Sequence, residues 1–146
     1  MPNYAIGVEY HGSKFHGWQR QFDQDTVQGA IENALSQVAD SQITLSAAGR
    51  TDAGVHSVGQ IANFQSDAKR DLVQWRRGVN SLTPKAINLA WIVEVDKDFH
   101  ARFSATARRY LYLFMDRQAD VHSDELVWNI GALDADLMHA HAQNLL

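Results

Sequence analysis

Apolar and polar residues follow two different periods along the first two thirds of the chain. Apolar side chains return at every second position over residues 4–10, the period of a β-strand, and every three or four positions over residues 27–38, the period of an α-helix. Both periods recur further on. They predict strands over residues 43–48, 58–64 and 87–95, and a second helix that begins near Asp71 and ends before Pro84.

This order of strand, helix, strand, strand, helix, strand predicts an α+β fold of the ferredoxin-like, split βαβ type. Right-handed crossovers then place both helices on one face of an antiparallel sheet and leave the other face free. Each helix is expected to begin with a capping box, formed by Asp25 with Gln28 and by Asp71 with Gln74.

Three more elements are expected after residue 100. Aromatic side chains alternate with Leu and Met over residues 107–116, which predicts a further strand buried on both faces. A short strand is expected within residues 126–131, and a C-terminal helix opens at residue 134 with no stop signal before Leu146. We therefore expect a single domain over residues 1–146 that belongs to a longer polypeptide.

The composition removes several classes of function. The 146 residues include no cysteine, which excludes disulfides, cysteine nucleophiles and cysteine metal ligands. No apolar run approaches the roughly 20 residues that span a bilayer, and the N-terminus lacks a secretion signal, so a cytoplasmic protein without a membrane partner is expected. The formal net charge of −4 gives no overall basic excess, so binding to nucleic acid would depend on local clusters.

The segment AGRTDAGVHS, residues 48–57, combines turn residues with a charged pair. Asp52 followed by Ala and Gly is ordinary turn chemistry, because Asp bonds nearby backbone groups and Gly accepts a positive φ. Arg50 precedes Asp52 by two positions, and residues i and i+2 of an extended segment point the same way. The guanidinium would keep the carboxylate ionised and fix its orientation. A turn needs neither, so Asp52 is a candidate catalytic residue.

Basic residues gather in three places, each with an aromatic neighbour. Arg20 lies near Trp18 in the loop after the first strand, a second group surrounds the second predicted helix, and Arg102 and Arg108 precede Tyr110. Lys and Arg bind phosphates, and unpaired bases stack on flat rings. These clusters are candidate RNA contacts, and the alternative for each one is an ordinary solvated surface.

Several segments resemble the TruA-type tRNA pseudouridine synthases. GRTDAGVHS resembles the catalytic motif of that family, YHGSKFHGWQRQ its early loop, TVQGAIENAL its first helix, GVNSLTPKAI the exit of its second helix, and DFHARFSATARRYLY the segment that leads to its active-site tyrosine. The resemblance runs in order from about Tyr4 to Tyr112. It implies that residues 1–146 are the N-terminal, catalytic-aspartate half of a two-half enzyme whose C-terminal half is absent from this sequence.

The resemblance also implies roles for individual residues. Asp52 matches the catalytic nucleophile, Arg50 the arginine that accompanies it, and Tyr110 the tyrosine that packs against the target base. Four further residues fall where the family contacts RNA: Trp18, Arg20, Arg102 and Arg108. The implied reaction converts uridine to pseudouridine in the tRNA anticodon stem-loop, at tRNA positions 38 to 40, without cofactor or metal, in a homodimer of which both subunits touch one tRNA.

Two other readings stay open. A non-catalytic RNA-binding module of ferredoxin-like fold would use the same basic and aromatic residues, but ARRYLYLF lacks the glycine and the spacing of the RNP1 pattern. A small metal-assisted hydrolase would use Asp52 and His56, but the His-Glu-x-x-His spacing of helical zinc sites is absent. Because the family's cleft lies between its two halves, this half is also expected to be inactive without the other.

Overall fold

The computed structural model describes residues 1–145, and the chain divides into two compact units, Met1–Arg108 (unit 1) and Arg109–Leu146 (unit 2). Unit 1 contains, in chain order, β1 (Asn3–Tyr10), the 3-10 turn η1 (Gly12–Lys14), α1 (Val27–Ala39), β2 (Ser46–Ala47), β3 (Ser57–Gln65), α2 (Leu72–Leu82) and β4 (Ile87–Val95). Unit 2 contains β5 (Phe114–Met115), β6 (Trp128–Asn129), α3 (Ala135–Ala142) and the 3-10 turn η2 (Gln143–Leu145). The single domain expected over residues 1–146, as half of a two-half enzyme, stays a prediction.

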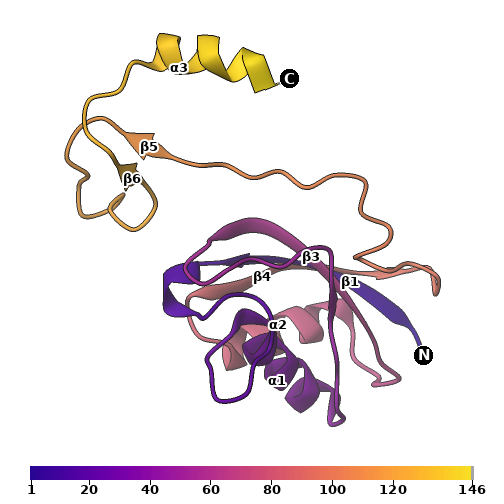
Figure 1. Cartoon of the computed structure of the whole chain (residues 1–146). Helices are drawn as coiled ribbons and strands as arrows, with labels where there is room; N and C mark the ends of the chain where they lie inside the picture. The colour runs from indigo at the N-terminus through magenta and orange to yellow at the C-terminus, as the bar shows by residue number, and fades with distance from the viewer. Residues whose placement is uncertain (146) are drawn as a thin grey trace. The chain divides into compact units, whose positions relative to one another are not determined.

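The four strands of unit 1 form one antiparallel sheet in the order β2-β3-β1-β4. β1 lies at the centre, where Tyr4 is opposite Phe64 of β3 and Glu94 of β4. Figure 1 shows α1 and α2 together on one side of this sheet. The predicted ferredoxin-like split βαβ arrangement, with both helices on one face, is confirmed.

The hydrophobic core lies between the sheet and the two helices. Alternate residues of β1 and β3 point toward the helices, whose apolar stripes are buried against them. The rings of Tyr4, Phe64 and Trp75 pack together with centroids 5.1 to 5.9 Å apart. All buried hydrophobic residues of the described chain lie between Tyr4 and Ala101, so unit 1 holds the core.

The two helices begin with different caps. Asp71 and Gln74 form the predicted capping box of α2, since the Gln74 N–H donates to Asp71 Oδ1 at 2.7 Å and the Asp71 N–H donates to Gln74 Oε1 at 3.0 Å. The box predicted from Asp25 and Gln28 is wrong. Thr26 is the N-cap of α1, where its hydroxyl accepts an N–H of the first turn. The Gln28 side chain instead accepts the Arg20 N–H and donates to Glu32.

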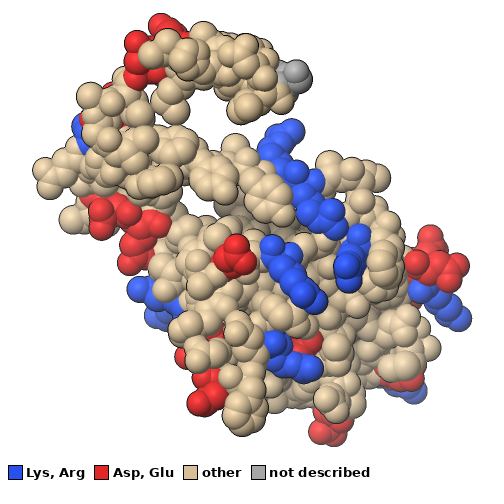
Figure 2. Space-filling model, in the orientation of Figure 1, with Lys and Arg blue, Asp and Glu red and all other residues tan. Residues whose placement is uncertain are grey.

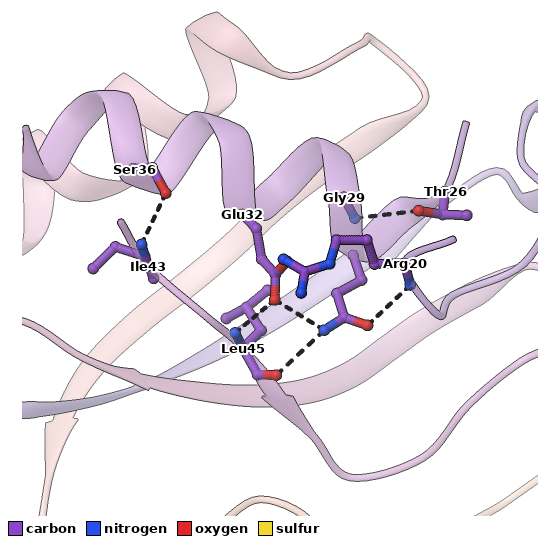
Figure 3. A network of polar contacts seen from close by, with 8 residues as sticks. Arg20, Thr26, Gly29, Glu32, Ser36, Ile43 and Leu45 are labelled. Carbon is purple, nitrogen blue, oxygen red and sulfur yellow. Dashed lines mark hydrogen bonds and ion pairs between the residues drawn. The ribbon is translucent and has the colours of Figure 1, made fainter. Parts of the chain in front are cut away.

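Glu32 of α1 is buried and fixes the segment that leads into β2. Its Oε1 accepts the Leu45 N–H at 2.8 Å and the Gln28 amide at 2.9 Å, while Oε2 is paired with Arg20 Nη1 at 2.8 Å (Figure 3). Side chains of α1 therefore satisfy backbone groups that a neighbouring strand would otherwise pair. For this reason the strand predicted over residues 43–48 is reduced to the two residues of β2.

The sheet face opposite the helices is partly covered, so the prediction that it is free is wrong. Asn3 Nδ2 donates to the carbonyl oxygens of Asp96 and Phe99, both at 2.9 Å, and Asn63 Oδ1 accepts the Ala101 N–H at 2.9 Å. The two buried amides also bond to each other at 3.0 Å. The segment after β4 is thereby held across the central strands β1 and β3.

Unit 2 has little regular structure. The strand predicted over residues 107–116 is wrong except at β5, which pairs in parallel with β6. Nothing in the described part of unit 2 pairs with residues 110–112 as a strand, and side chains 110–114 are exposed rather than buried on both faces. The predicted short strand and C-terminal helix are confirmed as β6 and α3. The α-helix ends at Ala142 and is followed by the 3-10 turn η2, whereas no stop was expected before Leu146, which itself lies outside the described residues.

Candidate active site

The loop that carries Asp52 joins β2 to β3. It ends in a turn that is closed by the Val55 N–H on the Asp52 carbonyl at 3.2 Å. Gly54 has a φ of +83°, a left-handed conformation that glycine adopts without a steric cost. The side chain of Asp52 is exposed at the start of this turn.

Thr51, the neighbour of Asp52, is held by the last residue of β1 and by the loop that follows β1. The Tyr10 hydroxyl and Thr51 Oγ1 are 2.8 Å apart, and the Trp18 N–H donates to the Thr51 carbonyl at 3.0 Å. Gly17 has a φ of +88°, and a Cβ added there would lie 2.8 Å from the Thr51 carbonyl oxygen. The backbone beside Asp52 is therefore fixed through both its side chain and its carbonyl.

The far end of the turn meets the same early loop. A Cβ on Gly12 would lie 2.0 Å from the Val55 carbonyl oxygen, so only glycine allows the two backbones this approach. The Gly12 N–H donates to His56 Nδ1 at 3.3 Å, and the ring of His11 lies edge-on to that of His56 with centroids 4.3 Å apart. Both ends of the Asp52 turn are thus packed against residues 11–18.

An open hollow of about 640 Å³ lies beside the Asp52 loop, within the size range of small-molecule sites. Its lining comes from the early loop and the Asp52 loop: His16, Gln19, Gln21, Gln24, Arg50, Thr51, Asp52 and Ala53. A second open hollow of about 640 Å³ holds none of the predicted site residues and is lined by Glu94, Val95, Asp96 and Phe99. The second hollow is lined by two carboxylates and no basic side chain, whereas the hollow beside Asp52 also has Arg50 on its wall, so it is the candidate active site.

Arg50 and Asp52 line the same hollow, but the predicted contact between the Arg50 guanidinium and the Asp52 carboxylate is absent. Within residues 1–145, no hydrogen bond or ion pair joins the guanidinium to the carboxylate. The physical reason is that β2 ends at Ala47, so the rule that alternate residues of a strand point the same way does not apply here. The hydrogen bonds of Tyr10 and Trp18 with Thr51 hold this part of the loop instead.

Two of the predicted RNA contacts have structural roles in unit 1. Trp18 is 1% exposed and packs against Tyr10 with ring centroids 5.9 Å apart, so the prediction that its ring contacts RNA is wrong. Arg20 has a half-exposed side chain, but its guanidinium is paired with the buried Glu32. The sequence of a basic loop does not show whether its aromatic side chains face the core or the solvent.

Arg102 and Arg108 differ in their partners. Arg102 lies over the ring of Phe103, with its guanidinium carbon 5.7 Å from the ring centroid, and stays exposed. Arg108 donates from Nε to the Ala48 carbonyl at 2.7 Å, and its Nη2 contacts the same oxygen. Both side chains are exposed, and they differ in that Arg108 is bonded to backbone carbonyls whereas the guanidinium of Arg102 lies over a ring.

The charges of the chain are divided unevenly. Residues 1–108 contain eleven basic residues (Lys and Arg) and eleven acidic residues (Asp and Glu). Residues 109–146 contain two basic and six acidic residues. The formal charge of −4 therefore belongs entirely to unit 2. Figure 2 shows Lys and Arg side chains spread over the visible face of unit 1, with acidic side chains mostly toward its edges.

Tyr110 belongs to unit 2, where its side chain is 62% exposed. The contact between its ring and a target base stays a prediction. Sequence reasoning also missed Gln60, whose buried amide donates to the Gly49 carbonyl at 2.9 Å. A polar residue at a core-facing position of an otherwise apolar strand was the available signal, because such a group must find a partner.

Three further observations concern metal ligands and the membrane. In the part of the chain that the structure describes, no three His, Cys, Asp or Glu side chains are grouped so as to hold a metal ion. His56 uses Nδ1 to accept the Gly12 N–H. No helix among residues 1–145 has the length and apolar character needed to cross a bilayer.

The loops around the hollow coincide with the part of the chain that matches a known family. A family model described as tRNA pseudouridine synthase matches residues 6–104. The chain belongs to this family. The match includes both loops that line the hollow, and the prediction of the family from the sequence is confirmed.

Curated relatives named tRNA pseudouridine synthase A are similar to nearly the whole chain. The protein of Shewanella frigidimarina (strain NCIMB 400) is 48% identical over 141 residues, which cover 95% of this chain and 54% of the relative. Those of Hydrogenovibrio crunogenus (strain DSM 25203 / XCL-2) and Escherichia coli (strain SE11) are 47% and 49% identical over 150 residues, covering 100% of this chain and 56% of each relative. The family member described here spans about half the length of these relatives.

Proposed function

We propose that this chain supplies the catalytic aspartate of a tRNA pseudouridine synthase that acts in the anticodon stem-loop, at tRNA positions 38 to 40. One observation carries the proposal: in a member of this family, Asp52 lies exposed on the wall of a hollow that is large enough for one nucleotide. The names of the relatives support the reaction. The hydrogen bonds that hold Thr51, next to Asp52, support a role for Asp52 that requires a fixed position.

The proposed reaction is an isomerisation, so no atom is gained or lost overall. The N1–C1′ bond breaks, the detached uracil turns, and C5 bonds to C1′ while the C5 proton leaves and N1 takes up a proton. An ionised Asp52 could begin this by attacking C1′, by attacking C6, or by removing a C2′ proton to give a glycal. All three routes need the carboxylate held against the nucleotide, and none requires a metal or cofactor.

The target base must leave its stack before Asp52 can reach it, at a cost of a few kcal/mol. We propose that Arg50, exposed on the same wall as Asp52, fills the space that the base vacates. Tyr110 is proposed to pack against the detached uracil and keep it bound while it turns. The exposed ring of Tyr110 is available for such a contact.

The binding partner proposed for the site is tRNA, in the cytoplasm. Arg102 is a proposed phosphate contact, because its guanidinium is exposed and lies over a ring rather than against a carboxylate. A second, C-terminal half and a homodimer, in which one tRNA touches both subunits, complete the proposed enzyme. The length of the relatives, about twice that of this chain, supports the second half.

Asp52→Asn tests the catalytic role directly. The variant keeps the size of the side chain and loses its charge, so turnover should fall below detection while tRNA binding is retained. Tritium release from tRNA labelled at uridine C5 measures turnover, and filter binding measures affinity. Both are measured in this chain and in a protein extended to the length of its relatives.

Asp25→Asn is the matched control, because it makes the same change in the early loop on a residue that does not line the hollow. It should leave tritium release unchanged. Normal release from Asp52→Asn would refute the proposal. An extended protein that binds tRNA without any release would instead favour the non-catalytic RNA-binding module.

A further inference from the structure

The two residues before Arg50 have their carbonyl groups held by side chains from other segments. Arg108 donates from Nε to the Ala48 carbonyl at 2.7 Å, with Nη2 on the same oxygen, and Gln60 Nε2 donates to the Gly49 carbonyl at 2.9 Å. The Ala48 N–H bonds to the Ile61 carbonyl at 2.8 Å. The chain is thus fixed at the point where it leaves the sheet for the Asp52 loop.

We propose that Arg108 and Gln60 are positioning residues for Asp52, which act by holding the carbonyls of Ala48 and Gly49. The inference rests on the proposed function, since it assigns to these residues the geometry of the carboxylate that the function uses. Arg108 and Gln60 hold the loop before Arg50, and the hydrogen bonds to Thr51 hold it after Arg50. A carboxylate displaced by about 1 Å can cost a hundredfold in rate.

Arg108 is suited to this role by its partners. Two of its nitrogen atoms converge on one carbonyl oxygen, and Nη2 also lies 3.4 Å from the Arg102 carbonyl. These bonds join the segment that crosses the sheet after β4 to the start of the Asp52 loop, sixty positions earlier in the chain. The Nε and Nη2 donors of Arg108 are occupied by protein carbonyls, so Arg108 is proposed to support the loop, and its predicted contact with RNA stays a prediction.

Gln60 is suited to the role by its burial. Its position on β3 is opposite Val8 of β1, on the face of the sheet that packs against the helices. A buried amide at such a position is costly unless it is bonded, and its bond is to the Gly49 carbonyl. Replacement by Met keeps the length of the side chain and removes the donor without adding charge.

The first experiment measures the loop without requiring activity. Hydrogen exchange is followed at the two hydrogen-bonded amides that flank the Asp52 loop, those of Ala48 and Val55, in the 146-residue chain, in Arg108→Gln and in Gln60→Met. Each variant should exchange roughly fivefold to tenfold faster there, the factor that corresponds to one net hydrogen bond. Lys97→Gln removes a positive charge from the same segment as Arg108 and should leave this exchange unchanged. Unchanged exchange in both variants would overturn the proposal, and Gln60→Met decides it if Arg108→Gln does not fold.

The second experiment separates positioning from RNA binding in a protein extended to the length of its relatives. Arg108→Gln and Gln60→Met should lower kcat roughly 10- to 100-fold and leave the Kd for tRNA equal to that of Lys97→Gln. An Arg108 that contacts phosphate would instead weaken binding and reduce the salt slope of log Kd by roughly 0.7 to 0.9 in Arg108→Gln, which would overturn its assignment. If Asp52→Asn kept its activity, the proposed function would fail while the exchange result still stood.

Discussion

Two glycines allow the early loop to touch the backbone of the Asp52 loop. Gly12 lies against the Val55 carbonyl and Gly17 against the Thr51 carbonyl, at distances that leave no room for a Cβ. Close approach of backbone to backbone gives a loop a fixed position without the entropy of long side chains. These contacts explain how the backbone that carries an exposed carboxylate can be held in one place.

Gly12→Ala should displace the Asp52 turn. The added methyl would meet the Val55 carbonyl at 2.0 Å, and the loop must shift to admit it. We expect a loss of about 1 to 3 kcal/mol in the free energy of unfolding, measured by urea denaturation, and a lower kcat. Gly59→Ala is the control, since its Cβ meets nothing within 4 Å, and it should change stability by less than about 0.5 kcal/mol. Equal losses in the two variants would contradict the argument.

At the scale of single residues, the sequence indicated the candidate catalytic residue, Asp52, but not the residues that hold its loop. Asp52 stands in a motif of local turn chemistry, and its exposure beside a hollow agrees with that reading. Trp18 was misassigned because burial depends on Tyr10 and the other residues that surround it in space. The support from Arg108 joins positions sixty residues apart, and no local pattern encodes such a pair.

At the scale of elements, α1 connects the early loop to the strand that leads to Asp52. Glu32 contributes one oxygen to the Leu45 N–H and the other to Arg20, whose backbone N–H bonds in turn to Gln28 Oε1 at 3.1 Å (Figure 3). Gln19 and Gln21, the neighbours of Arg20, line the hollow. The network therefore places one wall of the hollow relative to the helix.

A double-mutant cycle on Arg20 and Glu32 tests this connection. Arg20→Met leaves a carboxylate that is 4% exposed without its cation, whereas Arg20 itself is 54% exposed and remains solvated when Glu32 is changed. We expect a coupling free energy of about 1 kcal/mol, reduced by solvent screening of the exposed partner. Glu32→Gln should recover most of the loss caused by Arg20→Met, as measured by urea denaturation. Strict additivity of the two changes would show that the pair is not coupled.

The elements that were predicted correctly are those with local signals. The start of α2 follows from Asp71 and Gln74, three positions apart, and the structure has both bonds of that capping box. The strand predicted over residues 107–116 had the right alternation but lacks a neighbour to pair with in unit 2. A strand is stable only when it pairs with another strand, and the sequence of a strand does not show which segment it pairs with.

At the scale of the whole chain, core and charge are distributed in opposite ways between the two units. Unit 1 holds the buried hydrophobic residues and has equal numbers of acidic and basic residues, whereas unit 2 carries the net charge of −4. In the described part of unit 2, residues 109–145, no side chain is buried. Stability should therefore reside in unit 1, because burial of apolar surface is the main favourable term in folding.

Residues 1–108 should fold when expressed alone. The segment contains every strand of the four-stranded sheet, both helices packed on it, and the amide contacts of Asn3 and Asn63 that hold the chain after β4. We expect its Tm, followed by circular dichroism, to lie within about 4 °C of that of the 146-residue chain, a shift that corresponds to roughly 1 kcal/mol for a domain of this size. It should also self-associate less in light scattering, because unit 2 exposes Tyr110, Tyr112 and Trp128. A segment 1–108 that is unfolded, or that melts far below the longer chain, would show that unit 2 stabilises the sheet through contacts that the burial of its side chains does not reveal.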